Sequence, residues 1–193
     1  MIENYNDYKY YIAEDRKRYS VRWFDRFIFN ENYQIVSYLK TLRLLEYLQN
    51  TKHSNIINTI LYPFIFWNYK RKCNKLRIKI GINTCGPGLY IPHIGLIRVA
   101  PKAKLGKNCI IAPGVIIGTK HKHENVATIG DNVEITLGAK IIGKLTIGNN
   151  AIIAPNTVVV KDVPENAIVS GVPARIIKYR DSNNNIDYEA TDN

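Results

Sequence analysis

The amino-acid sequence predicts a mainly β protein, a parallel β-solenoid preceded by an α-helical segment. The main observation is an aliphatic residue that recurs at six-residue intervals through residues 99–163. These positions are Val99, Leu105, Ile111, Ile117, Ile129, Ile135, Ile141, Ile147, Ile153 and Val159. A period of six fits neither an α-helix, with a period of 3.6, nor an alternating strand, with a period of 2. We therefore expect three hexapeptides to form each triangular coil.

The first 79 residues carry a different pattern, in which apolar residues recur at helical spacing. The pattern covers residues 19–29, 33–48 and 56–67. The terminal coil of a solenoid exposes apolar surface and unpaired strand edges, so we expect the helices to cover it. The predicted organisation is a helical segment at 1–79, a solenoid domain at 80–178 and a disordered polar tail at 179–193.

The chain is basic, with a formal net charge of +11. A basic surface favours an anionic partner such as a nucleotide-bearing cofactor, a nucleotide sugar or a lipid headgroup. Nucleic acid is not expected, because the solenoid lysines are scattered and no recognition motif is present. The longest apolar stretch, 56–67, is about half a membrane span and is followed by a basic run at 70–79. Membrane contact is therefore expected to be peripheral at most.

The cysteines indicate the compartment. Cys73, Cys85 and Cys109 are odd in number and lack metal-binding spacing, which favours buried thiols in a reducing cytosol. The first eleven residues contain no apolar run typical of a secretory signal. The predicted location is cytoplasmic.

Two departures from the repeat indicate a site. The step from Ile91 to Val99 is eight residues instead of six, which should push His93 out of the stack. Residues 119–128 keep their length but lose the aliphatic pattern, which predicts a projecting loop. In a trimer of such prisms, this loop can reach the neighbouring subunit and enclose an intersubunit site with His93.

The loop carries two histidines in an HxH pattern. His121 and His123 have only Glu124 as a further ligand candidate nearby, which is fewer than a zinc site requires. We expect no metal here, and we expect these three side chains to line the binding site of the acceptor.

Longer motifs add a resemblance to a known family. They are Gly86-Pro87-Gly88-Leu89-Tyr90-Ile91-Pro92-His93, Val115-Ile116-Ile117-Gly118-Thr119, Ile129-Gly130-Asp131-Asn132-Val133, Leu137-Gly138-Ala139-Lys140, Lys161-Asp162-Val163-Pro164 and Gly171-Val172-Pro173-Ala174-Arg175. With these motifs the chain resembles a serine acetyltransferase. The front end, with Asp7-Tyr8-Lys9-Tyr10-Tyr11 and Glu14-Asp15-Arg16, is similar to the subgroup found with surface-polysaccharide genes.

The resemblance implies a left-handed parallel β-helix, a homotrimer or dimer of trimers, and transfer of acetyl from acetyl-CoA to a hydroxyl. The family's catalytic base falls on His93. The acetyl-CoA contacts fall on Gly118, Thr119, Gly138, Ala139, Ala154 and Pro155 for the pantetheine arm, and on Arg175 and Lys178 for the phosphates. Asp15 and Arg16 are candidate acceptor contacts at the front end.

The chain also departs from the family at two acidic positions. The aspartate that orients the family's histidine corresponds to Ile78, and Asn83 is the nearest polar replacement. A neighbouring subunit's Glu124 or a backbone carbonyl are the alternatives. The acidic residue that contacts the serine amine is replaced by Pro92.

Two further changes are Lys120-His121-Lys122-His123 in place of the arginine-histidine pair of the family's loop, and Asp192-Asn193 in place of the isoleucine that docks cysteine synthase. With Pro92, these changes lead us to predict an O-acetyltransferase acting on a sugar hydroxyl of a surface or capsular polysaccharide. The alternative is a serine O-acetyltransferase of cysteine biosynthesis. A non-enzymatic oligomeric scaffold is a third reading, which Ile78 permits and which the presence of His93 and Arg175 disfavours.

Overall fold

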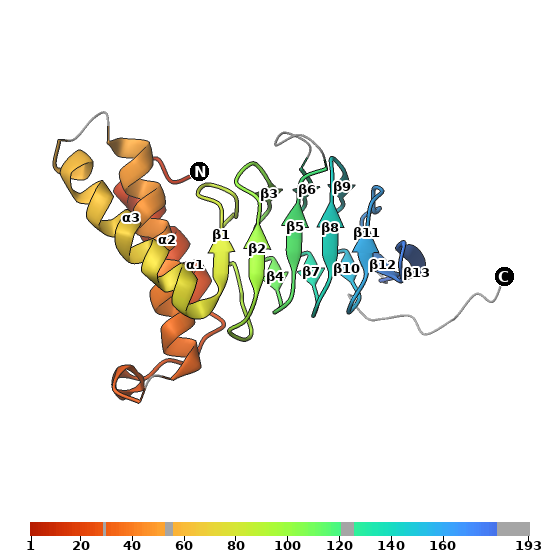
Figure 1. The fold of residues 1–193 in the computed structure, drawn as a ribbon, viewed down its shortest axis with the longest axis horizontal. Coiled ribbons are helices and arrows are strands. Elements are labelled where there is room, and N and C mark those ends of the chain that lie inside the picture. Colours follow the sequence, from red (N-terminus) through yellow and green to blue (C-terminus); the bar gives the residue numbers. More distant parts are fainter. Residues whose placement is uncertain (29, 53–55, 121–125, 181–193) are drawn as a thin grey trace.

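The chain forms a helical cap on one end of a three-sided β-prism (Figure 1). The computed structural model describes residues 1–28, 30–52, 56–120 and 126–180. The cap contains α1 (Tyr5–Arg16), the short 3₁₀ helix η1 (Trp23–Arg26), α2 (Glu31–Thr51) and α3 (Ile56–Leu76). The side chains of Asn4 and Asn30 cap α1 and α2 by accepting backbone N–H groups of the first turn.

Short strands form the prism. They are β1 (Ile78–Ile80), β2 (Ile97–Val99), β3 (Lys104–Leu105), β4 (Ile110–Ile111), β5 (Ile116–Gly118), β6 (Thr128–Ile129), β7 (Glu134–Ile135), β8 (Lys140–Ile142), β9 (Thr146–Ile147), β10 (Ile152–Ile153), β11 (Val158–Val159), β12 (Ala167–Ser170) and β13 (Arg175–Tyr179). The three sheets have the orders β1-β2-β5-β8-β11, β13-β12-β10-β7-β4 and β3-β6-β9. We call them the first, second and third sheets.

The strand register confirms the hexapeptide coil. Val99 lies opposite Ile117, and Ile141 lies opposite Val159, so each of these coils contains 18 residues. The coil from Ile117 to Ile141 contains 24 residues, because the segment predicted to project adds one hexad. The aliphatic positions point inward and are buried along the prism axis. Their burial provides the main stabilisation, about 1.5–3 kcal/mol for each fully buried side chain.

One corner of the prism carries a ladder of asparagines. Asn108, Asn132, Asn150 and Asn166 all have a positive φ, between 56° and 60°. Each amide donates to the next along the row, with N···O distances of 3.2, 3.1 and 3.0 Å. Asn tolerates the left-handed conformation and supplies a donor and an acceptor, so one residue type meets both demands of this corner.

Asn150 tests this corner because it both donates and accepts in the ladder. Asn150→Ala is expected to lower the free energy of unfolding by about 2–3 kcal/mol, from two lost hydrogen bonds and a strained φ. Asn150→Gly removes the same hydrogen bonds without the strain and should lose about 1 kcal/mol less. Urea denaturation measures both variants. Equal losses would show that backbone strain plays no part.

The prism extends slightly beyond the predicted domain limits. β1 begins at Ile78 instead of residue 80. At the other end, β13 runs to Tyr179, and Arg180 donates its backbone N–H to Asn166 over 2.8 Å. Residues 179 and 180 are therefore paired in the structure and are not part of a disordered tail. Residues 181–193, the rest of that predicted tail, lie outside the described part of the chain.

The predicted burial of the cysteines is confirmed. Cys73, Cys85 and Cys109 are buried and form no disulfide with one another. Burial raises the pKa of Cys85 to about 12 and that of Cys109 to about 11, so neither is a reactive thiolate near neutral pH. None of the described helices has the length and hydropathy of a transmembrane span.

Candidate active site

His93 lies on one corner of the prism, where the first coil turns from the second sheet into the first sheet. The bridge between Tyr90 and Ile110 ends the second-sheet side, and β2 begins at Ile97. Later coils turn at the same corner at 112–114, 136–139 and 154–157. Backbone hydrogen bonds connect the successive turns, from Gly114 to Leu96, from Gly138 to Pro113 and from Asn156 to Leu137. We call this row of turns the His93 edge.

A carboxylate from the cap holds the His93 turn. Glu31, the first residue of α2, places Oε2 3.3 Å from His93 Nδ1 and accepts the Ile94 backbone N–H at Oε1 over 2.6 Å. The Ile94 N–H is the largest contribution that lowers the pKa of Glu31, and the contact with His93 lowers it further. Glu31 is therefore ionised near neutral pH and contacts both the His93 side chain and the Ile94 backbone of this turn.

This geometry suits a general base. When Nδ1–H of His93 donates to Glu31, the lone pair of the neutral imidazole lies on Nε2. The His93 side chain is 68% exposed, so Nε2 is open to a ligand, while Glu31 is 44% exposed. A carboxylate in this place fixes the tautomer and stabilises the imidazolium that forms on proton abstraction.

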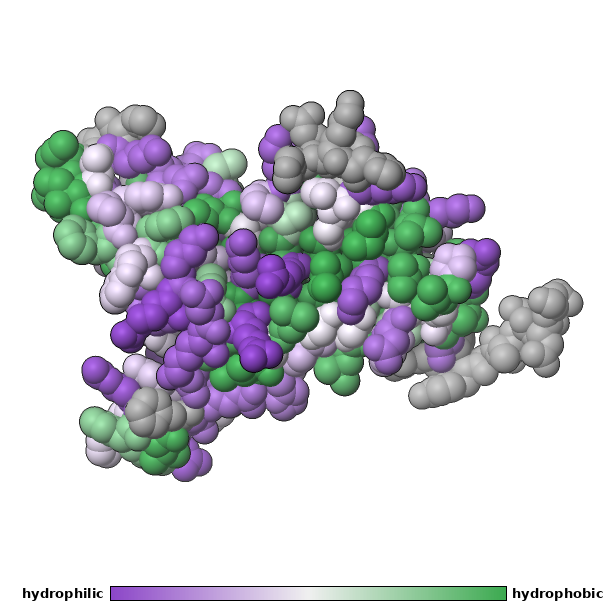
Figure 2. Space-filling model, viewed as in Figure 1, coloured by the Kyte–Doolittle hydropathy of each residue, from purple (hydrophilic) through white to green (hydrophobic). Residues whose placement is uncertain are grey.

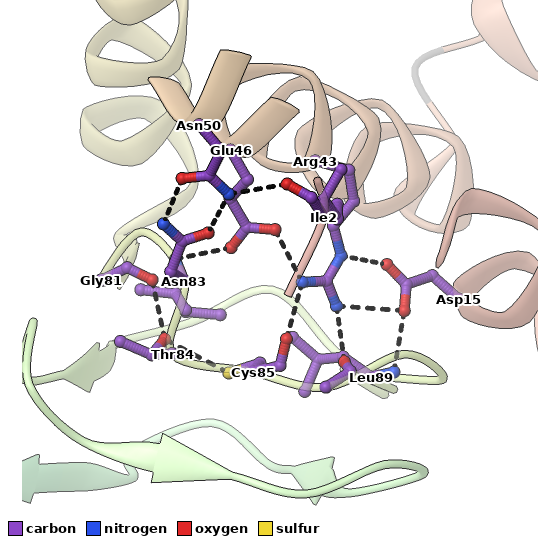
Figure 3. Close-up of polar contacts among 12 residues, drawn as sticks. Ile2, Asp15, Arg43, Glu46, Asn50, Gly81, Asn83, Thr84, Cys85 and Leu89 are labelled. Carbon is purple, nitrogen blue, oxygen red and sulfur yellow. Dashed lines mark hydrogen bonds and ion pairs between the residues drawn. The ribbon is translucent and has the colours of Figure 1, made fainter. Parts of the chain in front are cut away.

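The prediction that Asn83 orients His93 is wrong. Asn83 lies on a different corner, where the chain leaves β1, and it exchanges amide hydrogen bonds with Asn50 over 3.1 and 2.8 Å (Figure 3). Its backbone N–H donates to Glu46. Sequence proximity to His93 was a poor guide, because consecutive hexads turn at different corners.

The prediction that Asp15 contacts the acceptor is also inconsistent with the structure. Asp15 is buried between the cap and the first coil, where it pairs with Arg43 Nε over 2.8 Å and accepts the Leu89 backbone N–H (Figure 3). Arg43 also donates to Glu46 and to the carbonyls of Cys85 and Gly86. We call Asp15, Arg43 and Glu46 the junction cluster. It fastens the helices to the first coil.

Arg16 is better placed than Asp15. It is exposed and lines a shallow hollow that includes Tyr19. The Tyr19 hydroxyl donates to the carbonyl of Ile91 over 3.0 Å and accepts its N–H over 2.8 Å. Tyr19 thus fixes the backbone two residues before His93. The sequence pattern gave no sign of this role.

The predicted acetyl-CoA contacts divide between two edges of the first sheet. Gly138, Ala154 and Pro155 lie on the His93 edge. Arg175, the first residue of β13, lies at the far end of this edge, where the preceding residue, Ala174, donates its backbone N–H to the Val158 carbonyl. Lys178 lies further along β13, opposite Ile168. Gly118, the last residue of β5, and Thr119, which follows it, lie on the opposite edge. The side chain of Ala139 is buried in the prism, so a ligand could meet this residue only at its backbone.

Gly118 and Gly138 differ in how strictly their surroundings require glycine. At Gly138 a Cβ would lie 2.2 Å from Asn156 Oδ1, and φ is +73°, so the corner itself demands glycine. At Gly118 the nearest atom to a Cβ is Ile142 Cδ1 at 3.3 Å, and φ is not positive. Packing thus demands glycine less strictly at 118 than at 138, because the end of the flexible Ile142 side chain needs to shift by only a few tenths of an ångström.

The two glycines make a matched pair of variants. Gly138→Ala is expected to lower the free energy of unfolding by about 1–3 kcal/mol. Gly118→Ala should change it by less than about 0.5 kcal/mol, but should raise KM for acetyl-CoA. Thermal melting and steady-state kinetics separate the two effects. Unchanged KM in Gly118→Ala would remove Gly118 from the acetyl-CoA path.

The remaining predicted residues cannot be placed. His121, His123 and Glu124 lie outside the described residues. Within residues 1–120 and 126–180, apart from the gaps at 29 and 53–55, no three His, Cys, Asp or Glu side chains form a cluster suited to a metal ion.

The curated proteins that this chain matches are named serine acetyltransferases. No family model matches the chain. A serine acetyltransferase of Synechococcus elongatus is 35% identical over 94 residues, which cover 48% of this chain and 38% of that protein. The chain spans less than half the length of the curated relatives that it matches.

Solved structures of serine acetyltransferases match almost the whole fold. The Brucella abortus enzyme in complex with coenzyme A has a TM-score of 0.70 and 28% identity, and covers 90% of this chain and 67% of its own. The Neisseria gonorrhoeae enzyme in complex with serine has a TM-score of 0.63 and 26% identity, and covers 89% and 68%. These matches confirm the predicted left-handed β-helix with an N-terminal helical segment.

Proposed function

We propose that this chain, a serine acetyltransferase-like hexapeptide-repeat protein, transfers an acetyl group from acetyl-CoA to a hydroxyl. The observation that carries the proposal is the Glu31–His93 pair at the head of the His93 edge. Glu31 supplies the carboxylate that the substitution at Ile78 removed. Because Glu31 of the cap provides this carboxylate, the Ile78 substitution no longer favours a non-enzymatic scaffold.

In the proposed reaction, Nε2 of His93 takes the proton of the acceptor hydroxyl as its oxygen attacks the thioester carbonyl. The tetrahedral intermediate then collapses and expels the CoA thiolate. The thiolate takes the proton from the imidazolium, so His93 returns to its starting state. No covalent intermediate on the protein is required, and Glu31 stays ionised while stabilising the positive ring.

We place the CoA portion along the His93 edge. Coils stack about 4.8 Å apart, so the four coil steps from the His93 turn to the Arg175 end span about 20 Å. Only an extended ligand can reach from one to the other. Arg175, exposed at the far end, would meet the phosphates, and the small residues Gly138 and Ala154 would let the arm approach the backbone.

We further propose a homotrimer as the active form. Gly118 and Thr119 lie on the opposite edge of the first sheet from His93, so one chain cannot bring them together. Packing one prism beside another can place this edge next to the neighbour's His93 edge. The acetyl-CoA path then uses residues of two subunits.

L-Serine is the acceptor that we propose, which gives preference to the alternative over the predicted sugar. The relatives are named serine acetyltransferases, and one solved structure contains serine. The half-exposed Glu31 carboxylate beside His93 can also receive the ammonium group of an amino acid. A sugar hydroxyl is the second candidate, because Pro92 occupies the position next to His93 where the family has an acidic residue.

Release of free CoA thiol from acetyl-CoA tests the function. L-serine is compared with a panel of nucleotide sugars and oligosaccharides. Turnover with serine alone would support the proposal, and turnover with sugars alone would establish the second candidate. No thiol release with any acceptor, from protein that is folded and trimeric, would contradict the enzyme proposal and favour a scaffold.

A further inference from the structure

The outward side of α3 is apolar and exposed. The inward side packs Tyr69, Cys73 and Leu76 against the cap and the first coil. The outward side bears six large apolar residues that are 44–71% exposed, which we call the α3 stripe: Ile56, Ile57, Ile60, Leu61, Phe64 and Trp67. A helix that is apolar on both sides is typical of a site where another molecule or a membrane covers the second side.

All charged residues of α3 are cationic. The helix contains no acidic residue, and four cations fall within its last seven residues: Lys70, Arg71, Lys72 and Lys75. Steps of four residues from Trp67 lead to Arg71 and Lys75, so these two cations continue the line of the stripe. The Arg71 guanidinium lies over the Trp67 ring, 5.9 Å from its centroid. The stripe therefore passes from apolar to cationic along one line of the helix.

The cationic end of α3 meets η1 across a groove of about 380 Å³. Its nine lining residues include Arg26, Arg71, Lys72 and Lys75 and no acidic residue. Lys72 donates to Ser37 and Thr41 rather than to a carboxylate. Burial, and then the nearby Arg71 cation, lower the pKa of Lys72 to about 8.

Apolar side chains also flank the other side of the groove. Around η1, the residues Trp23, Phe24, Phe27 and Ile28 are exposed. Figure 2 shows apolar residues at both tips of the cap, near the start of α3 and around η1, with hydrophilic residues between them. We call the α3 stripe, the groove and these four residues the cap surface.

We propose that the cap surface docks this protein on an anionic lipid bilayer. Tryptophan, phenylalanine and isoleucine of the stripe and η1 would enter the headgroup region, while the groove cations contact lipid phosphates. Tryptophan is well suited to this boundary because its ring is apolar and its N–H is polar. A second copy of the chain fits less well, because self-complementary pairing would bring two grooves lined by cations together.

The intrinsic fluorescence of the chain reports on this surface directly. Trp23 and Trp67 are its two tryptophans, and they are 83% and 67% exposed. Vesicles of phosphatidylcholine mixed with phosphatidylglycerol should shift the emission to the blue and sediment the protein, and added salt should weaken both effects. Vesicles of phosphatidylcholine alone should do neither. Trp23→Phe and Trp67→Phe should each retain a blue shift from the remaining tryptophan.

Charge reversal provides the specific test. Arg71→Glu/Lys75→Glu should weaken binding to the mixed vesicles at least about 25-fold, at about fivefold for each cation lost. Lys144→Glu/Lys161→Glu changes the net charge equally at exposed positions on the prism and should retain binding. Equal losses in both double variants would overturn the proposal, because binding would then follow net charge alone.

A substitution in the α3 stripe distinguishes docking on a bilayer from docking on a second copy of the chain. Phe64→Ser should weaken vesicle binding without changing the sedimentation coefficient or the thermal melt in solution. A smaller assembly with undiminished vesicle binding would overturn the proposal and make the stripe a subunit interface. These measurements follow binding and not transfer, so their outcome is independent of the proposed enzymatic function.

Discussion

Arg43→Met is expected to lower the free energy of unfolding by about 3–5 kcal/mol, the largest loss from any single substitution considered for this chain. The variant keeps the volume of the side chain but leaves Asp15 and Glu46 buried without their cation. It also leaves the carbonyls of Cys85 and Gly86 without their donor. Urea denaturation followed by circular dichroism measures the loss.

The loss should depend on pH. Burial already raises the pKa of Glu46 even with Arg43 beside it. Without Arg43, the folded-state pKa of Glu46 rises further above the unfolded value, so the folded state binds more protons. Stability of the variant should therefore fall as pH rises from the unfolded pKa of about 4 through the raised folded value.

Two controls distinguish the junction cluster from the mere removal of an arginine. Arg16→Met deletes an exposed arginine of the same cap and should change stability by less than about 0.5 kcal/mol. The triple variant Asp15→Asn/Arg43→Met/Glu46→Gln removes the unpaired charges and should recover part of the loss. A triple variant less stable than Arg43→Met alone would contradict this account.

His93→Ala is expected to reduce kcat about 10²–10⁴-fold, which corresponds to about 3–5 kcal/mol of barrier. The fold should be unaffected, since the His93 side chain is mostly exposed. Thiol release under saturating acetyl-CoA measures the change, and a thermal melt checks the fold. Unchanged activity would remove His93 from the reaction.

Glu31→Gln tests the positioning residue. It retains a hydrogen-bond acceptor for the Ile94 N–H but loses the charge that stabilises the imidazolium. We expect kcat to fall about 10–100-fold while KM for acetyl-CoA is unchanged. A rise in KM for serine alone, with kcat unchanged, would show instead that Glu31 binds the acceptor ammonium.

Asn83→Ala serves as the comparison variant for Glu31→Gln, because sequence reasoning assigned the orienting role to Asn83. In the structure its partners are Asn50 and Glu46, at another corner. Its loss should reduce stability and leave kcat of the folded enzyme unchanged. A kcat loss equal to that of Glu31→Gln would reinstate Asn83.

The prism was predictable from the sequence because its rule is local. Each hexad requires an inward aliphatic residue at the same position, so the spacing alone identifies Ile117, Ile141 and Val159 as core residues. The displaced turn at His93 was visible for the same reason, as an error in that spacing. The helices were visible from their own periodicity.

The partner of His93 was not predictable. Glu31 is 62 residues away in the sequence, and the angle at which α2 meets the first coil decides the contact. The same angle buries Asp15, which resembled an exposed acidic residue at a helix end. A weak signal was present: Asn30 followed by Glu31 marks a helix start, where a carboxylate is favoured but its target is unknown.

The reversal of the chain at β13 also matters for solubility. Parallel coils stacked in one direction form a template that can grow without limit, as in a fibril, if either end stays open. Here the helices cover the first coil, while β13 turns back and runs antiparallel along β12. Within the described residues, the second sheet therefore offers no free parallel edge at its C-terminal end, which disfavours end-to-end growth of the prism.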